Sequence, residues 1–171
     1  MPTQQERRDA TQAAILAAAV AEYSAAGHAL VSVEAIANRA GVAKSTLLYH
    51  FGSRDELLQS VVVELVTSME SAIAGRGLND VESWTVAVLE TQHSTVGRLL
   101  FGIGDDLATR GALESGDPLP YLVGRLRDYS VENAEVVGAA MLQFGRELAY
   151  GRAGLADVAA FASLLAESRQ P

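Results

Sequence analysis

Apolar residues recur at helical spacing through most of this sequence, and this periodicity limits the possible folds more than any other feature. Near the N-terminus, Ile15, Leu16, Ala19 and Tyr23 fall on one stripe of a helix. No segment shows the convincing alternation of apolar and polar residues that a half-buried strand requires. Because 49% of the residues are apolar, the chain can also form a buried core. The sequence therefore predicts an all-α protein.

Capping and helix-breaking residues divide the chain into the expected helices. The clearest start signal is the capping-box sequence from Ser53 to Glu56, directly before Leu57 and Leu58. We expect helices over residues 4–26, 33–40, 43–51, 54–71, 81–92, 95–110, 119–129, 132–150 and 155–167. We place the boundary between two modules, residues 1–58 and 59–171, at the fourth of these helices.

The net charge of −8 argues at first against a protein that binds nucleic acid, because phosphate contacts require cations. The charge is unevenly distributed, however. Residues 1–58 carry five basic and six acidic side chains, whereas residues 59–171 carry eight basic and fifteen acidic ones. The N-terminal module is thus nearly neutral and can bind DNA if its cations share one face. Lys44, the only lysine of the chain, is a candidate for such a contact.

The residues give little support to an enzymatic function, and we predict no enzymatic activity. The chain has no cysteine, which excludes disulfides, thiolate metal sites and cysteine nucleophiles. His28, His50 and His93 are far apart and form no i, i+4 ligand pair, so we expect no metal site. Gly102 and Gly104 lack the rest of a phosphate-binding loop, and we predict no cofactor. The polar N-terminus and the lack of a long apolar run predict a cytoplasmic protein without a membrane partner.

Two short expected helices joined by a glycine turn fit a helix-turn-helix between residues 33 and 51. Ala37 is small where the helices must cross closely, and Gly41 can adopt the left-handed conformation that the turn requires. Leu47 and Phe51 lie four positions apart and form the inward face of the second helix. On or beside its outward face lie a cation, a hydroxyl and two aromatic rings with polar tips, which suit contacts with phosphates or base edges in a major groove. These outward residues are Lys44, Ser45, Tyr49 and His50.

The stretch from about residue 14 to residue 58 contains the segments AILAAAVAEYSAAG and SVEAIANRAGVAKSTLLYHFGSRDELL. Its distinguishing features are Tyr23, Gly27, Ile36-Ala37, Ala40-Gly41-Val42, Thr46-Leu47, His50-Phe51 and Leu57-Leu58. In these features it resembles the N-terminal DNA-binding domain of the TetR/AcrR family, over about a quarter of the chain. The resemblance implies a three-helix domain whose third helix enters the major groove. It also implies a connecting fourth helix and a C-terminal helical bundle that binds a ligand and dimerises.

The resemblance also suggests individual DNA contacts. Thr46 and Arg54 are expected to contact phosphates, while the four outward residues approach the bases. Two positions depart from the family pattern. Ala43 stands where a hydroxyl residue usually caps the recognition helix, and the loss of such a cap typically costs ~1 kcal/mol. Leu48 stands where the family usually has a tyrosine that contacts a phosphate.

The last two expected helices are apolar on more than one side. We predict that one stripe faces the protein's own bundle and that a second copy of the chain covers another stripe, in a four-helix dimer interface. A core helix buried within one chain is the alternative. The residues assigned to the dimer interface are Gly138, Met141, Gly145, Leu148, Leu155, Val158, Ala162 and Leu165.

The middle helices contain aromatic and polar-tipped residues that are candidates to line a pocket for a small-molecule effector. They are Trp84, His93, Arg98, Phe101 and Tyr121. Each of them also has an ordinary explanation, as a core residue or as a solvated surface residue.

The sequence thus predicts a transcription regulator that binds double-stranded DNA as a homodimer. In this prediction it represses from a palindromic operator and is released by an effector; repression is implied by the resemblance alone. The alternative is a helix-turn-helix protein that has lost specific DNA binding and serves as a protein-interaction module. The acidic charge and the departures at Ala43 and Leu48 favour that alternative. Salt-sensitive, specific DNA binding distinguishes the two.

Overall fold

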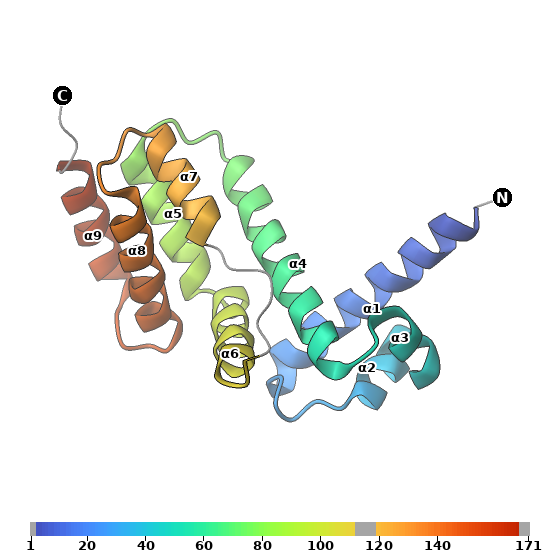
Figure 1. Ribbon diagram of the computed structural model, residues 1–171. Coiled ribbons are helices and arrows are strands. Elements are labelled where there is room, and N and C mark those ends of the chain that lie inside the picture. The colour runs from blue at the N-terminus through green and yellow to red at the C-terminus, as the bar shows by residue number, and fades with distance from the viewer. Residues whose placement is uncertain (1–2, 112–118, 168–171) are drawn as a thin grey trace. The chain divides into compact units, whose positions relative to one another are not determined.

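The computed structural model describes residues 3–111 and 119–167, and these ranges contain helices and no strand (Figure 1). The helices are α1 (Gln4–Ala26), α2 (Val33–Ala40), α3 (Lys44–Phe51), α4 (Arg54–Ala74), α5 (Val81–His93), α6 (Thr95–Thr109), α7 (Leu119–Asp128), α8 (Ala134–Ala149) and α9 (Leu155–Glu167). Their bounds lie close to those expected from the sequence. The all-α fold class is confirmed.

Side-chain caps explain where several helices begin. Ser32 Oγ accepts a hydrogen bond from the backbone N–H of Ala35 at 3.1 Å, which satisfies a free donor in the first turn of α2. The expected capping box at the start of α4 is present. The N–H of Glu56 donates to Ser53 Oγ at 3.2 Å, and the N–H of Ser53 donates to Glu56 Oε2 at 2.8 Å. These local bonds set the starts of α2 and α4.

The chain divides into two compact units, and the divisions fall within α4 and α6. We call them the N-terminal unit, residues 1–64 with 102–115, and the C-terminal unit, residues 65–101 with 116–171. The modules expected from the sequence met at residue 58 and assigned residues 102–115 to the C-terminal module. In the structure, the last part of α6 belongs to the N-terminal unit.

The N-terminal unit is built around α1, which packs on α2 and α3. Ile15 and Ala19 of α1, Ile36 of α2, and Leu47 and Phe51 of α3 are all buried. These residues are the apolar positions that recur with helical period in the sequence. The same periodicity that predicted the helices therefore forms the core that holds α3 in place.

In the C-terminal unit, α5 packs on α8 and α9, and α7 packs on α8. Trp84 of α5 lies at the centre of the main apolar cluster, where its ring packs against Tyr129 with ring centroids 5.8 Å apart. The cluster comprises Ile73, Val81, Trp84, Val88, Leu122, Val123, Leu126, Tyr129, Val131, Ala134, Met141 and Leu165. This unit thus has its own hydrophobic core.

By length and composition, α4 is the one helix among the described residues that is apolar enough to cross a membrane. Its most apolar window has a mean hydropathy of 1.4, and 39% of that window is buried within the protein. Leu57, Leu58 and Val61 are fully buried in it. Core helices of soluble proteins meet the same criterion, so α4 gives only weak support to a membrane span.

Candidate functional site

The second helix of the helix-turn-helix, α3, is anchored by its inward face. Leu47 is fully buried and Phe51 is 5% exposed. Gly41, between α2 and α3, has φ +70° and ψ 27°, the left-handed conformation that favours glycine. The turn therefore has the geometry that the sequence predicted, and it leads the chain directly into α3.

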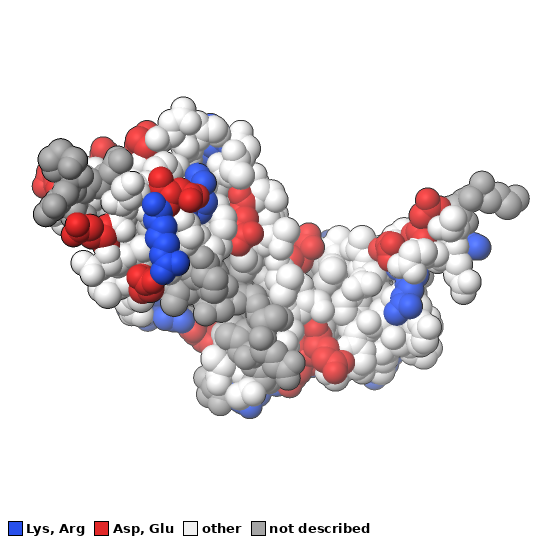
Figure 2. Space-filling model, turned by 45° about the horizontal axis from the view of Figure 1, so that its top comes forward, with Lys and Arg blue, Asp and Glu red and all other residues white. Residues whose placement is uncertain are grey.

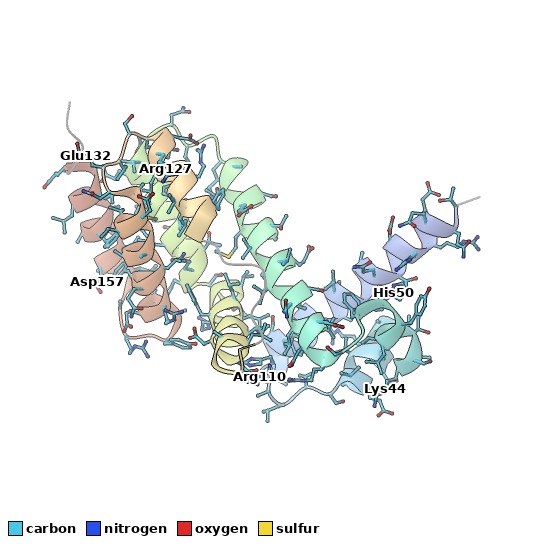
Figure 3. The ribbon with its side chains drawn as sticks, viewed as in Figure 1. Lys44, His50, Arg110, Arg127, Glu132 and Asp157 are labelled. Atoms are coloured by element: carbon cyan, nitrogen blue, oxygen red, sulfur yellow. The ribbon has the colours of Figure 1, made fainter. Side chains whose placement is uncertain are left out.

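The outward face of α3 carries the polar residues that the sequence singled out. Lys44 and Ser45 are exposed, and Tyr49 is 75% exposed. Lys44 and His50 lie at opposite ends of α3 (Figure 3). His50 and Thr46 are half-buried, and His50 Nδ1 is buried without a hydrogen-bond partner in the described part of the chain. The face that would meet DNA therefore combines a cation, a hydroxyl and an exposed aromatic ring.

Arg54, which the resemblance assigns to a phosphate, makes a contact within the N-terminal unit. Its Nη2 donates a hydrogen bond to the carbonyl oxygen of His28 at 2.6 Å, and its side chain is half-buried. Burial raises the pKa of nearby Tyr23, and the positive charge of Arg54 partly offsets that rise. Arg54 thus joins the start of α4 to the segment after α1. The phosphate contact assigned to Arg54 stays a prediction.

The two departures from the family pattern have clear local consequences. Ala43 has φ −70° and ψ 148°, suitable for an N-cap, but it provides no side-chain hydrogen bond to the first turn of α3. Leu48 is half-buried, whereas its neighbour Tyr49 extends into solvent. The recognition helix therefore begins without a side-chain cap and presents its tyrosine one position later.

Most ion pairs of the described chain join residues on the protein surface. In the N-terminal unit, Arg39 pairs with Glu22 at 2.9 Å. In the C-terminal unit, Arg125 pairs with Asp128 at 3.0 Å. Figure 2 shows long basic side chains flanked by acidic ones on the face in view. Many of the cations are therefore neutralised within the chain.

The C-terminal unit encloses a small, mainly apolar cavity of about 20 Å³. It is lined by Val66, Met69, Glu70, Ile73, Val88, Gln92, Leu100, Tyr121 and Leu122. Gln92 is 2% exposed, and its Oε1 has no hydrogen-bond partner among the described residues. A buried amide oxygen without a partner is energetically costly.

Of the five residues proposed to line an effector pocket, Tyr121 lines this cavity, and burial raises its pKa. The other four do not line it. Trp84 is a core residue, and Phe101 is buried with the guanidinium of Arg146 over its ring. His93 Nδ1 lies 3.1 Å from the carbonyl oxygen of Leu148, and Arg98 is exposed.

Sequence reasoning missed Gln92, because its neighbours Glu90, Thr91 and His93 are also polar. Gln92 and Thr85 are the buried polar side chains of α5. The neighbour of Gln92 across the unit is Gly145, where a Cβ would lie 1.7 Å from Gln92 Oε1. The contact thus pairs a polar side chain of α5 with a glycine of α8.

The burial of the residues assigned to a dimer interface contradicts our prediction for the last two helices. Seven of the eight, Gly138, Met141, Gly145, Leu148, Val158, Ala162 and Leu165, are buried within the C-terminal unit. A second copy of the chain cannot contact them, so this part of the prediction is wrong. Leu155 is 53% exposed and can still contribute. The other apolar face of α8 and α9 is the exposed one, with Val136 at 70% and Leu164 at 67%.

No group of His, Asp or Glu side chains among the described residues is arranged to hold a metal ion. The chain has no cysteine to add to such a group. Among the described residues, the polar residues of α3 and the cavity of the C-terminal unit are two candidate sites.

Comparison with known proteins agrees with this geometry. Residues 15–61 match the family model described as bacterial regulatory proteins, tetR family. The multidrug binding protein EbrR, solved in complex with imidazole, is similar over 100% of this chain and 95% of its own, with a TM-score of 0.76 and 16% identity. A TetR-family transcriptional regulator from Rhodococcus sp. has a TM-score of 0.71 over 94% of this chain and 98% of its own, at 16% identity. No curated protein sequence is significantly similar to this chain.

A helix-turn-helix with an anchored inner face and a polar outer face, joined to a second helical unit, is an arrangement typical of DNA-binding transcriptional regulators. The chain has the fold of a TetR-family transcriptional regulator, and residues 15–61 form its TetR-type N-terminal domain.

Proposed function

We propose that this protein binds a palindromic operator as a homodimer, represses transcription from it, and is released by a small molecule held in the C-terminal unit. The observation that carries the proposal is the division of α3 into two faces. Leu47 and Phe51 fix the helix to the N-terminal unit, while Lys44, Ser45 and Tyr49 face solvent. Repression, as opposed to activation, follows from the likeness to TetR-family regulators.

In this proposal, α3 enters the major groove. Lys44 is its only full cation, and it can reach the O6 and N7 acceptors of a guanine. Tyr49 and Ser45 supply hydroxyl groups for base edges or phosphates. His50 approaches a base from the far end of the helix, and half-buried Thr46 contacts a phosphate. Arg54 supports the domain through its hydrogen bond to His28.

Selection of bound sites from random oligonucleotides, followed by affinity measurements at several salt concentrations, tests DNA binding. Lys44→Gln should weaken binding to the selected site by roughly 1–3 kcal/mol if Lys44 contacts a guanine. Arg76→Gln is the matched control, because it removes the same charge from the C-terminal unit, where Arg76 pairs with Glu90. If no site is enriched at modest salt, DNA binding is refuted and the protein-interaction alternative takes its place.

The homodimer would form through the exposed apolar face of α8 and α9. Val136, Leu155 and Leu164 are the large apolar side chains exposed on these helices within the described residues. A single copy of α3 contacts few base pairs, and two-fold pairing on a palindrome is the usual way to increase specificity. Val136→Glu combined with Leu164→Glu should give a monomer in sedimentation analysis. A single Leu30→Glu change should not, because Leu30, 84% exposed, lies in the N-terminal unit. A dimer that survives the double substitution excludes this interface.

The effector is proposed to occupy the cavity around Gln92 and Tyr121. At about 20 Å³ the cavity has room for about one water molecule, so a larger ligand must displace side chains and helices. No basic side chain lines the cavity, whereas Glu70 and Gln92 offer oxygen acceptors. These features favour an apolar ligand with a donor group or a positive charge over an apolar carboxylate.

Matched ligands of one chain length test this chemistry. Octylamine should raise the melting temperature of the protein and weaken its complex with the selected DNA, whereas octanoate should do neither. Gln92→Leu should reduce the response to octylamine, because it removes the buried acceptor. A stronger response to octanoate than to octylamine would reverse the assignment. The cytoplasmic location and the lack of enzymatic activity stay predictions from the sequence.

A further inference from the structure

The first part of α1 projects beyond the core of the N-terminal unit (Figure 1). Ile15 is the first buried residue of this helix, so residues 4–14 include no buried side chain. The segment is nevertheless a continuous helix that begins with a capping box between Thr3 and Glu6. An exposed helical segment of this length has no role in the core, so its ordered shape points to a function on the surface.

The polar residues of this segment are sorted between its two sides. Gln4, Arg7, Arg8 and Thr11 precede Ile15 at intervals of three and four and therefore share its face, which points toward the rest of the unit. Glu6 and Asp9 lie on other sides of the helix, where Glu6 takes part in the cap and Asp9 accepts a hydrogen bond from Gln5. The basic side chains thus lie on the side of α1 that faces the rest of the unit, and the acidic side chains lie on other sides.

A groove of about 510 Å³ lies between this basic face and the end of α3. It is lined by Gln4, Gln5, Arg7, Arg8, Thr11, Tyr49 and His50. The guanidinium carbon of Arg8 lies 6.0 Å from the centroid of the Tyr49 ring. No carboxylate lines the groove, although acidic residues outnumber basic ones in the chain. The groove is therefore locally basic, and it is directly adjacent to the recognition helix.

The other arginines of the N-terminal unit are already engaged. Arg39 pairs with Glu22, Arg110 pairs with Asp55 and Asp106, and Arg54 donates to a backbone carbonyl. Arg7, Arg8 and Lys44, by contrast, make no ion pair with a carboxylate in the part of the chain that the structure describes. Lys44 begins α3 and the groove adjoins its last turn, so uncommitted cations lie at both ends of the recognition helix.

We propose that this groove binds the sugar–phosphate backbone of DNA beside the base pairs that α3 contacts, with Arg7 and Arg8 on its phosphates. This inference rests on the proposed DNA-binding function and extends the contact surface beyond the helix-turn-helix. A guanidinium can bind two phosphate oxygens at once, which suits this role. The ring of Tyr49 lies beside Arg8, with its centroid 6.0 Å from the guanidinium carbon. The contact is independent of base sequence, so it adds affinity and orientation but no discrimination between sites.

The test compares wild-type protein with Arg7→Gln/Arg8→Gln on the selected site and on a scrambled duplex, across a range of salt concentrations. The double variant should bind both duplexes several-fold more weakly, by the same factor. The slope of log affinity against log salt concentration should become shallower by about one for each phosphate that the variant no longer neutralises. Trimming the flanking base pairs should weaken wild-type binding but leave the double variant unchanged.

Arg76→Gln/Arg127→Gln is the matched control, because it makes the same change in net charge within the C-terminal unit and should leave the slope unchanged. Arg7 and Arg8 are exposed, so the double variant should keep the wild-type melting temperature. If the double variant binds with wild-type affinity and slope, the groove does not contact DNA. If the wild-type protein binds no selected site at all, the DNA-binding function itself is refuted, which is a distinct outcome.

Discussion

Arg110 Nη1 donates a hydrogen bond to Asp55 Oδ1 at 2.6 Å, which joins the residue after α6 to the first turn of α4. Nη2 of the same guanidinium bonds to Asp106 Oδ2 at 3.0 Å, and that carboxylate lies 3.4 Å from His28 Nε2. All these residues belong to the N-terminal unit. Figure 3 labels Arg110 beside α6. This network fixes the end of α6 to the DNA-binding domain, while Leu100, earlier on the same helix, lines the cavity of the C-terminal unit.

The first prediction concerns this network. Arg110→Ala should accelerate amide hydrogen exchange in residues 103–109, because it removes two bonds that hold the end of α6. The increase should be several-fold at most, since exposed ion pairs are individually weak. Arg98→Ala is the control, because Arg98 lies on the same helix and its hydrogen bonds within the described chain go to nearby His93 and Thr95. Equal acceleration by both variants would show that the network does not hold α6.

The helices could be predicted from the sequence because their signals are local. Ser32 and the Ser53–Glu56 capping box fix helix starts through bonds three residues apart, and Gly41 marks a turn by its own conformation. The outward position of Tyr49 follows in the same way, because it lies two residues after inward Leu47 and therefore on the opposite side of the helix. Each of these signals lies within a single helix or turn.

The remaining features depend on contacts between distant residues, which the pattern does not encode. On α8, two stripes are made of small or apolar residues, and periodicity alone does not choose which one faces inward. The choice follows from Gly145, whose missing side chain makes room for Gln92 of α5. The bond of Arg54 to the carbonyl of His28 spans 26 residues, so a local pattern does not reveal it either.

The second prediction uses the close approach of Gly145 to Gln92. A Cβ at position 145 would lie 1.7 Å from Gln92 Oε1 and 2.5 Å from its Cδ. Gly145→Ala should therefore destabilise the protein by about 1 kcal/mol, because overpacking in a buried region outweighs the gain in helix propensity. Chemical denaturation at equilibrium measures the change in unfolding free energy.

Two further variants test whether the Gln92 side chain causes this destabilisation. In a Gln92→Ala background the added methyl group meets no amide, so Gly145→Ala should become stabilising, by about 0.5–1 kcal/mol. Gly124→Ala, in α7, should stabilise the wild-type protein to the same extent, since nothing lies within 4 Å of a Cβ there. Destabilisation by Gly145→Ala that persists without the Gln92 side chain would assign the effect to another contact.

The third prediction concerns pH and the N-cap of α5. Asp80 Oδ1 accepts a hydrogen bond from the N–H of Ser83 at 2.7 Å, and this bond holds the pKa of Asp80 below its ordinary value of 3.8. A lowered folded-state pKa means that the ionised cap stabilises the protein above pH 3.8 and loses this effect as pH falls through the folded-state value. Asp80→Ala should therefore lower the melting temperature at pH 7, and the difference from wild type should shrink below about pH 4.

Asp80→Asn separates the cap from the charge. Asparagine caps helices about as well as aspartate, but its acceptor does not titrate. This variant should stay close to wild type at pH 7 and should not lose its cap at low pH. Other carboxylates titrate in the same range, including Glu135 and Glu147, whose pKa values are also lowered, so each variant is compared with wild type at the same pH. A pH-independent deficit in Asp80→Ala would contradict the ionised cap.

The fourth prediction concerns the start of the recognition helix, where Ala43 occupies the N-cap of α3. Its backbone, with φ −70° and ψ 148°, is close to that of Ser32, with φ −84° and ψ 152°, which caps α2. Ala43→Ser should therefore add a hydrogen bond to the first turn and raise the unfolding free energy by about 1 kcal/mol. Ser32→Ala should lower it by a similar amount. Because a better ordered α3 loses less conformational entropy on binding, Ala43→Ser should also tighten binding to the selected DNA. Equilibrium unfolding of both variants measures these changes in free energy. Ala43→Val is the control, because it adds bulk without a hydrogen-bond acceptor. Equal stability of the Ala43→Ser and Ala43→Val variants would mean that the recognition helix gains nothing from a cap.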